Sequence, residues 1–215
     1  VVPFSEQEAQ NLTSHKGVVN GYGATFRQFI DNVKQLGNTV RYYFGKVSED
    51  LGTAIHNATG FDVSGYNIVI RSDEVTHTLS QHGDSAKEAL RGQLPVTADV
   101  LERLPEIFSE PDEIIPLKDK DYAGRDAFEI RKQIDGYMVA VVGVANGKNS
   151  IEVDTVYIID KKGKSPATSN TGQMTDLSHT SETSSGPTST DSIPQATQKS
   201  KRVLSGAELG AFGPQ

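Results

Sequence analysis

The segment FEIRKQIDGYMVAVVGVANGKNSIEVDTVYIID, residues 128–160, decides the fold of this chain. Its first part alternates apolar and polar side chains, as a strand with one buried face does. Asp135-Gly136 is a strong hairpin turn, and the nearly continuous apolar run from Tyr137 to Ala145 is typical of a central strand. After a second turn, alternation resumes from Ile151 to Ile159. Residues 112–160 therefore predict an antiparallel meander of three or four strands. The residues expected to be buried around it are Ile130, Val139 and Val141, with Leu79 and Leu101 packed on the sheet.

The residues before this meander follow a helical period instead. Apolar spacing predicts helices from Phe26 to Leu36 and from Val40 to Ile55, and two glycines in the second pattern allow two shorter helices there. A short strand is predicted at Asn67–Arg71. Three further helices are predicted to begin near Ser72, Asp84 and Thr97. Helices first and strands last predict an α+β domain, with N-terminal helices followed by a three- to four-stranded antiparallel sheet.

The two ends of the chain differ from this central part. Residues 1–25 are polar and include a turn-like run, which predicts a flexible segment. In residues 164–215, 18 of 52 side chains are Ser or Thr and no periodic apolar pattern appears, which predicts a disordered tail. The tail explains why only 35% of the chain is apolar, against roughly 45–50% in globular domains. The predicted organisation is a flexible segment at 1–25, a folded domain at 26–163 and a disordered tail at 164–215.

Composition excludes several classes of protein. The net charge is −7, and residues 26–163 carry 16 basic and 22 acidic side chains, so any polyanion site must be a local basic patch in an acidic molecule. The lack of cysteine excludes disulfides, thiolate metal sites and a cysteine nucleophile. No apolar run approaches the ~20 residues that a membrane span needs. No glycine-rich phosphate loop is present, and we expect no cofactor.

Two of the five histidines, His77 and His82, lie in the helix predicted to begin near Ser72. Five residues separate them by about 140° on a helix, so they do not share a face as a metal-binding pair would, and no metal site is predicted. His82 lies in line with Val75 and Leu79 on the buried side, in the last turn, where the helix dipole favours an imidazolium ion. It is therefore a candidate general acid. The alternative is a helix-end histidine that hydrogen-bonds a free carbonyl.

Hydroxyl and basic side chains supply the remaining candidates. Thr155 and Tyr157 lie on one face of the last strand, where hydroxyls hold a phosphate or orient a base. The alternative is that both residues simply fill a pleated surface, since threonine and tyrosine favour strands. Arg91, Arg131 and Lys132 are available cations, but acidic residues are interleaved with them, which is typical of a solvated surface.

Several short motifs in order along the chain resemble one family. They are Gly45-Lys46-Val47-Ser48, Ala58-Thr59-Gly60-Phe61-Asp62-Val63-Ser64-Gly65-Tyr66, the His77/His82-Gly83-Asp84 element, Arg91-Gly92-Gln93-Leu94-Pro95-Val96-Thr97 and Leu104-Pro105-Glu106-Ile107. From about Phe26 to Lys162 the chain resembles the phage-associated nuclease-like domains grouped with barnase, EndoU, colicin-type tRNases and RelE. These domains occur in phage polyvalent proteins, in head-morphogenesis proteins of the MuF type and in toxin-like proteins. The resemblance implies two helices followed by a four-stranded antiparallel sheet.

The resemblance also implies metal-independent endoribonuclease activity. A base takes the proton of the ribose 2′-hydroxyl, which attacks the adjacent phosphate, and an acid protonates the leaving 5′-oxygen, giving a 2′,3′-cyclic phosphate. The implied acid is His82 and the implied base or positioning group is His77, with the two roles exchangeable. Thr155 and Arg91 are implied phosphate contacts. The implied substrate-binding set is Arg91, Tyr157, Arg131 and Lys132.

The implied partners are RNA, with tRNA among the candidates, and an immunity or antitoxin protein, with no membrane. The implied location is the cytoplasm of a bacterial host or target cell, reached with a phage particle or by secretion. Two other functions stay open at this point. One is a non-catalytic protein–protein interaction module of a phage polyvalent or head-morphogenesis protein, and the other is a DNA nuclease on the same scaffold.

The tail gives the first testable prediction. Residues 164–215 have too little apolar surface to offset an ordering cost of ~1–2 kcal/mol per residue. Truncation after Gly163 should therefore leave the melting temperature within a few degrees of that of the full chain, as measured by thermal unfolding. A large drop would mean that the tail docks on the domain.

Overall fold

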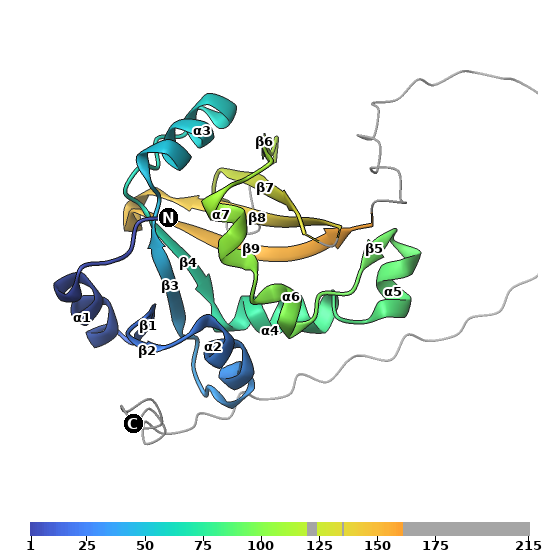
Figure 1. Cartoon of the computed structure of the whole chain (residues 1–215), viewed down its shortest axis with the longest axis horizontal. Coiled ribbons are helices and arrows are strands. Elements are labelled where there is room, and N and C mark those ends of the chain that lie inside the picture. The colour runs from blue at the N-terminus through green and yellow to red at the C-terminus, as the bar shows by residue number, and fades with distance from the viewer. Residues whose placement is uncertain (120–123, 135, 161–215) are drawn as a thin grey trace, which may run out of the picture.

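The computed structural model describes residues 1–119, 124–134 and 136–160, so the predicted tail lies outside the described residues. They form an α+β fold in which helices pack against one mixed sheet (Figure 1). The helices are α1 (Glu6–Ser14), α2 (Phe26–Asn32), α3 (Glu49–Thr59), α4 (Ser72–Gln81), α5 (Ser85–Leu90), α6 (Ala98–Leu101) and α7 (Leu104–Ser109), with short 3-10 helices η1 (Val33–Gln35) and η2 (Asn146–Lys148). The strands are β1 (Gly17–Asn20), β2 (Gly23–Ala24), β3 (Arg41–Lys46), β4 (Asn67–Arg71), β5 (Gln93–Leu94), β6 (Glu113–Pro116), β7 (Ala127–Gln133), β8 (Tyr137–Ala145) and β9 (Ser150–Ile159). In the part of the chain that is described, no helix is both long and apolar enough to cross a membrane.

The sheet contains the predicted meander and extends beyond it. Its strand order is β2-β1-β3-β4-β9-β8-β7-β6, and β5 also pairs with β9. Strands β6 to β9 form the expected antiparallel meander, with β6 as the fourth strand. The prediction of a three- to four-stranded antiparallel sheet is nevertheless too narrow, because β1 runs parallel to both β2 and β3, and β4 runs parallel to β9. Among the additional strands, β4 confirms the short strand predicted at Asn67–Arg71, whereas β1 and β2 come from the segment predicted as flexible and β3 from a segment predicted as helix.

The helical prediction between Val40 and Ile55 is half wrong. Arg41–Lys46 is a strand, in which Tyr42 and Phe44 are buried on one face and Tyr43 points to the other. Aromatic residues at alternate positions favour a strand, and this preference outweighs the helical spacing of Val40, Phe44 and Val47. The later half is helix α3, and Ser48 caps it by accepting a hydrogen bond from the backbone N–H of Leu51 at 3.3 Å.

Residues 1–25, predicted as a flexible segment, contribute α1, β1 and β2 to the structure. Strand β1 pairs with β3, and Val19 is buried with Phe4 and Ala9 in a small apolar cluster beside Tyr43. In α1, Ala9 is the one buried residue. Residues 1–25 therefore have the polar composition of a loop, although they extend the sheet.

The main core lies on one face of the sheet. Helices α2, α3, α6 and α7, with the buried side of α4, cover this face, and Ile130 and Leu101 are fully buried in it while Leu79 packs against it. From β8 the core takes Met138, Ala140 and Val142 rather than Val139 and Val141. Val139 is fully buried on the opposite face of the sheet, whereas Val141 is only half-buried there, which corrects its prediction as a core residue.

An irregularity in β9 decides which residues face the helices. The pairing of β9 with β8 shifts at Asp154, because Val153 lies opposite Val142 while Thr155 lies opposite Val141. Val153 and Val156 both belong to the main core, so the alternation reverses across this β-bulge. The bulge turns Thr155 and Tyr157 to the face opposite the helices, away from Ile151 and Val153.

The N-terminal cluster gives a prediction about stability. Val19→Asp would bury a carboxyl group among Phe4, Ala9 and Tyr43 with no charge partner in that cluster, and should lower the free energy of unfolding by several kcal/mol. The control is Val2→Asp, because Val2 is 45% exposed and its substitution should be nearly neutral. Chemical denaturation of both variants measures the difference. Equal stabilities would mean that residues 1–25 are not part of the cooperative unit.

Candidate functional site

Helix α4 carries the two candidate histidines and lies along β9 where β4 has ended. Its fully buried Thr78 accepts a hydrogen bond from the backbone N–H of Val156 at 3.3 Å, so the helix caps the open edge of β9. His82 follows as the C-cap residue, and its ring centroid lies 6.1 Å from that of Tyr157. Packing against the strand therefore brings His82 to the side of the sheet that Tyr157 faces.

The chain turns sharply after His82. Gly83 does not adopt the left-handed conformation expected of a helix stop; instead, a Cβ at this position would lie 2.2 Å from the carbonyl oxygen of Leu79. Glycine is therefore required for close approach of the backbone. Asp84 then caps α5 by accepting hydrogen bonds from two backbone N–H groups, and the short helix directs Glu88 back toward His82.

A buried carboxylate joins two of the candidate residues. Glu88 is fully buried, and its Oε2 lies 3.1 Å from Nδ1 of His82 while its Oε1 accepts a hydrogen bond of 2.7 Å from Nη1 of Arg91. The His82 side chain is 15% exposed and that of Arg91 is 50% exposed. His82 is thus held by a carboxylate and not by a free helix carbonyl. Among the described residues, the other ring nitrogen of His82 has no hydrogen-bond partner, and half of the Arg91 side chain is exposed.

A second cluster lies on the meander itself. The Tyr157 hydroxyl donates to Oε1 of Glu129 at 2.8 Å, and Arg131 donates to Oε2 of Glu129 through both Nε, at 3.0 Å, and Nη2. Glu129 and Thr155 both lie opposite Val141, and Arg131 and Tyr157 both lie opposite Val139, so all four point to the same face. We call Glu129, Arg131, Thr155 and Tyr157 the polar face. Burial, followed by the hydrogen bond to Glu129, raises the pKa of Tyr157, which stays a proton donor.

The remaining candidate residues, Thr155, His77 and Lys132, lie in three different environments. The Thr155 hydroxyl oxygen is buried and has no hydrogen-bond partner among the described residues. His77 is exposed on α4, about 100° around the helix from Thr78, which contacts β9. Lys132 projects to the face opposite its neighbour Arg131 and donates to the carbonyl oxygen of Glu110 at 2.6 Å. The structure therefore brings His82, Arg91, Arg131, Thr155 and Tyr157 to one side of the sheet, whereas Lys132 points to the other face. No side-chain hydrogen bond joins exposed His77 to any of these residues among those that the structure describes.

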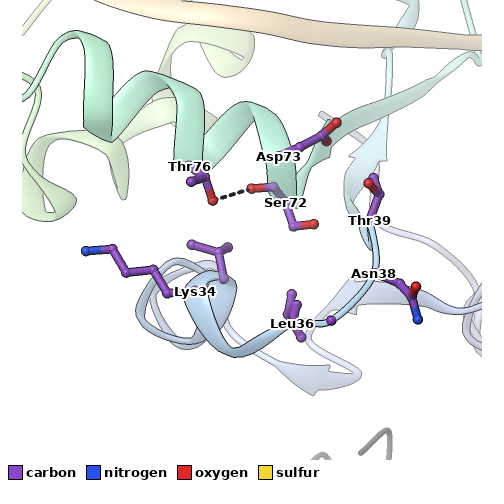
Figure 2. Close-up of a pocket in the computed structure, with 9 residues that line it drawn as sticks. Lys34, Leu36, Asn38, Thr39, Ser72, Asp73 and Thr76 are labelled. Carbon is purple, nitrogen blue, oxygen red and sulfur yellow. Dashed lines mark hydrogen bonds between the residues drawn. The ribbon is translucent and has the colours of Figure 1, made fainter. Parts of the chain in front are cut away.

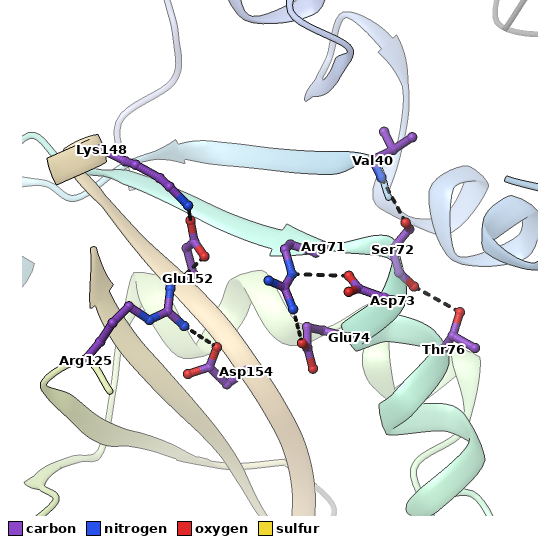
Figure 3. Close-up of polar contacts among 10 residues, drawn as sticks. All are labelled: Val40, Arg71, Ser72, Asp73, Glu74, Thr76, Arg125, Lys148, Glu152 and Asp154. Carbon is purple, nitrogen blue, oxygen red and sulfur yellow. Dashed lines mark hydrogen bonds and ion pairs between the residues drawn. The ribbon is translucent and has the colours of Figure 1, made fainter. Parts of the chain in front are cut away.

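Charged residues continue along the same side of the sheet (Figure 3). Arg125 donates to Glu152 at 2.6 Å and to Asp154 at 2.7 Å, and both carboxylates are nearly buried. Arg71 bonds Asp73 and Glu74 at the start of α4. Burial opposes the charge of Glu152, but Arg125 and Lys148 outweigh it and hold the pKa of this carboxyl below its ordinary value. On this side of the sheet, Arg71 and Arg125 are thus paired with carboxylates of the same chain.

A separate pocket of about 450 Å³ lies at the other end of α4 (Figure 2). It is lined by η1, the following loop and the first turn of α4, including Lys34, Asn38, Ser72 and Thr76. The Ser72 hydroxyl accepts a hydrogen bond from the backbone N–H of Val40, and Asp73 pairs with Arg71. The pocket holds none of the candidate residues, and its polar groups serve the start of the helix.

The sequence comparison assigns a family to this arrangement. The family model described as phage-Barnase-EndoU-ColicinE5/D-RelE like nuclease3 matches residues 45–165, which is more than half of the chain. The chain belongs to this nuclease family. No curated protein and no solved structure gives a significant match. The resemblance predicted from the sequence is confirmed, and family membership supports a nuclease function in general terms. The matched region contains every residue of the polar face as well as His82, Glu88 and Arg91.

Two site residues were missing from the sequence prediction. Glu129 alternates with Phe128 and Ile130, so the pattern places it on the face away from the core, but only the structure shows its partners from β7 and β9. Glu88 carries no sequence signal, because a glutamate in a short polar helix is normally exposed. Among the residues that the structure describes, no group of three or more metal-ligating side chains is arranged to hold an ion.

The polar face gives a prediction about stability and pH. Tyr157→Phe removes a hydrogen bond to a carboxylate and should lower the free energy of unfolding by about 1–2 kcal/mol near neutral pH. Because the pKa of Tyr157 is raised in the fold, the unfolded chain loses this proton at about pH 10 before the folded chain does. The contribution of the hydroxyl is therefore present below about pH 10 and falls above it. Urea denaturation at several pH values should show the gap between the wild type and the variant narrowing at alkaline pH.

The matched control is Tyr66→Phe. The Tyr66 hydroxyl also donates to a side-chain oxygen, that of Asn146 at 3.1 Å, but this pair is exposed and neutral. Its loss should cost less than about 0.5 kcal/mol. Equal costs for the two variants would contradict the description of Tyr157 as a buried donor to a carboxylate.

Proposed function

We propose that this chain is a metal-independent endoribonuclease that cleaves RNA through a 2′,3′-cyclic phosphate. The observation that carries the proposal is the position of His82, held at Nδ1 by buried Glu88 and lying beside Tyr157 of the polar face. A histidine oriented by a carboxylate is a common arrangement for proton transfer. Since the nucleophile is the ribose 2′-hydroxyl of the substrate, the reaction requires no activated water.

The proposed roles divide between the two clusters. A base removes the proton of the 2′-hydroxyl, whose oxygen attacks phosphorus, and His82 gives a proton to the 5′-oxygen as its bond to phosphorus breaks. We assign the base to Glu129 in place of His77. Glu129 lies on the same side of the sheet as His82, with Tyr157 between them, whereas His77 is exposed and no side-chain hydrogen bond joins it to these residues.

The proposed phosphate contacts come from the same side. Arg91 is fixed at one end by Glu88 and keeps half of its side chain exposed, which suits contact with a non-bridging phosphate oxygen. Arg131 is a further candidate. The Thr155 hydroxyl has no hydrogen-bond partner among the described residues but is buried, so its contact with phosphate stays a prediction from the resemblance. Lys132 points to the opposite face and has no part in this proposal. RNA as the partner, an inhibitory partner protein and a cytoplasmic location stay predictions from the resemblance.

One observation favours the non-catalytic alternative. Arg71, Arg125 and Arg131 all bond carboxylates of the same chain, and residues 26–163 carry more acids than bases. A phosphate must compete with these partners, whereas a protein–protein interaction module needs no phosphate site. The alternative predicts a folded domain without RNA cleavage.

The deciding experiment incubates the purified chain with total RNA in EDTA and determines the chemistry of the new ends. We expect cleavage with 2′,3′-cyclic phosphate ends and no cleavage at a 2′-deoxy position. His82→Ala and Glu129→Gln should each lower the rate about 10²–10⁴-fold. His56→Ala is the control, because His56 lies on α3 and pairs with exposed Asp62.

Four outcomes would overturn all or part of the proposal. Metal-dependent cleavage of DNA, or the absence of any cleavage by the folded wild type, would end the ribonuclease assignment. Full activity in Glu129→Gln together with loss in His77→Ala would return the role of base to His77. Full activity in folded His82→Ala would remove His82 from the reaction.

A further inference from the structure

Glu88 has an environment that is unusual for a carboxylate. Its side chain is fully buried, although the neighbouring residues of α5, from Ser85 to Lys87 and from Ala89 to Leu90, are exposed. Burial of a charged group is unfavourable unless partners compensate it, and an apolar residue of similar volume would fill this position at lower cost. Each oxygen of Glu88 has a nitrogen partner, Nδ1 of His82 for Oε2 and Nη1 of Arg91 for Oε1. A purely structural role does not require this pairing.

We propose that Glu88 is the positioning residue for His82, an inference that rests on the proposed ribonuclease function. An ionised carboxylate has lone pairs but no hydrogen to donate, so Nδ1 of His82 must carry the shared hydrogen. Nε2 is then the ring nitrogen that exchanges protons: it bears the lone pair in the neutral ring and the transferable proton in the cation. Glu88 thereby directs proton transfer to Nε2.

The same carboxylate also fixes a cation next to the ring. Arg91 bonds Oε1 while His82 bonds Oε2, so the guanidinium and the imidazole have a constant separation set by one carboxylate group. The Tyr157 ring lies beside the imidazole, with ring centroids 6.1 Å apart and planes inclined at 34°. The proposed proton donor and the proposed phosphate contact are therefore oriented together before substrate binds, which lowers the cost of ordering them in the reaction.

Glu88→Gln tests this role with almost no change of shape. The amide oxygen of the variant still accepts from Arg91, but its NH₂ group donates to Nδ1, which places the ring hydrogen on Nε2. Nitrogen-15 NMR of the imidazole at alkaline pH, where the ring is neutral, distinguishes the two tautomers. We expect the Nδ1–H form of His82 in the wild type and the Nε2–H form in the variant, with RNA cleavage lowered about 10²–10⁴-fold.

The matched control is Glu106→Gln. Glu106 also forms an ion pair with an arginine three residues away, Arg103, but it is half-exposed and has no histidine partner. The control should keep the His82 tautomer, the rate of cleavage and the thermal stability of the wild type. Circular dichroism and thermal unfolding of the wild type, Glu88→Gln and Glu106→Gln show whether a loss of activity comes from a misplaced His82 ring or from an unfolded protein.

The NMR measurement tests the role of Glu88, and the cleavage measurement also tests the proposed function, so the two proposals can be overturned separately. An Nε2–H ring for His82 in the wild type overturns the proposal without any variant, and it does so even if Glu88→Gln does not fold. Full cleavage activity in folded Glu88→Gln also overturns it. If the wild type cleaves no RNA, the proposed function fails, and the tautomer still shows whether Glu88 orients His82.

Discussion

The bulge at Asp154 is the constraint on which the site depends. A strand with regular alternation would keep Thr155 and Tyr157 on the same face as Ile151 and Val153, under the helices. One extra residue reverses the alternation, so Val156 still fills the core while Tyr157 reaches Glu129 on the other side. A single irregularity in β9 thus supplies both a continuous core and a polar face, and it shifts the register of β9 against β8 by one residue.

The backbone at the edge of β9 determines where His82 of the candidate site lies. Strand β4 pairs with β9 only as far as Val153, and β5 pairs with its last two residues, so the backbone between them needs another partner. Thr78 of α4 supplies it at Val156, and the helix that satisfies this edge ends at His82. The position of the histidine is therefore a consequence of how the sheet edge is capped, and α5 then fixes its ring through Glu88.

The sequence predicts the parts of the fold that depend on local patterns. The meander, the helix starts at Asp84 and Thr97 and the buried direction of His82 all follow from alternation, capping residues or helical spacing. Strand β3 was missed because helical spacing and aromatic alternation coincide over six residues, and the N-terminal strands were missed because they are short and polar. The burial of Glu88 could not be predicted, because it depends on how α5 folds back toward His82 after Gly83. The bulge could not be predicted either, because it depends on the pairing of β9 with β8.

The electrostatics of this side of the sheet explain how an acidic chain can carry arginines suited to phosphate. Arg71, Arg125 and Arg131 are each held by carboxylates, which fixes their geometry and cancels their field at long range. A polyanion therefore gains little from diffusing toward this surface, in contrast to a protein with a strongly basic face. In the proposed function, we expect contact where a cation keeps exposed donors beside His82, and half-exposed Arg91 meets that condition. For such a site we expect selectivity to come from short-range fit around His82 rather than from general affinity for nucleic acid.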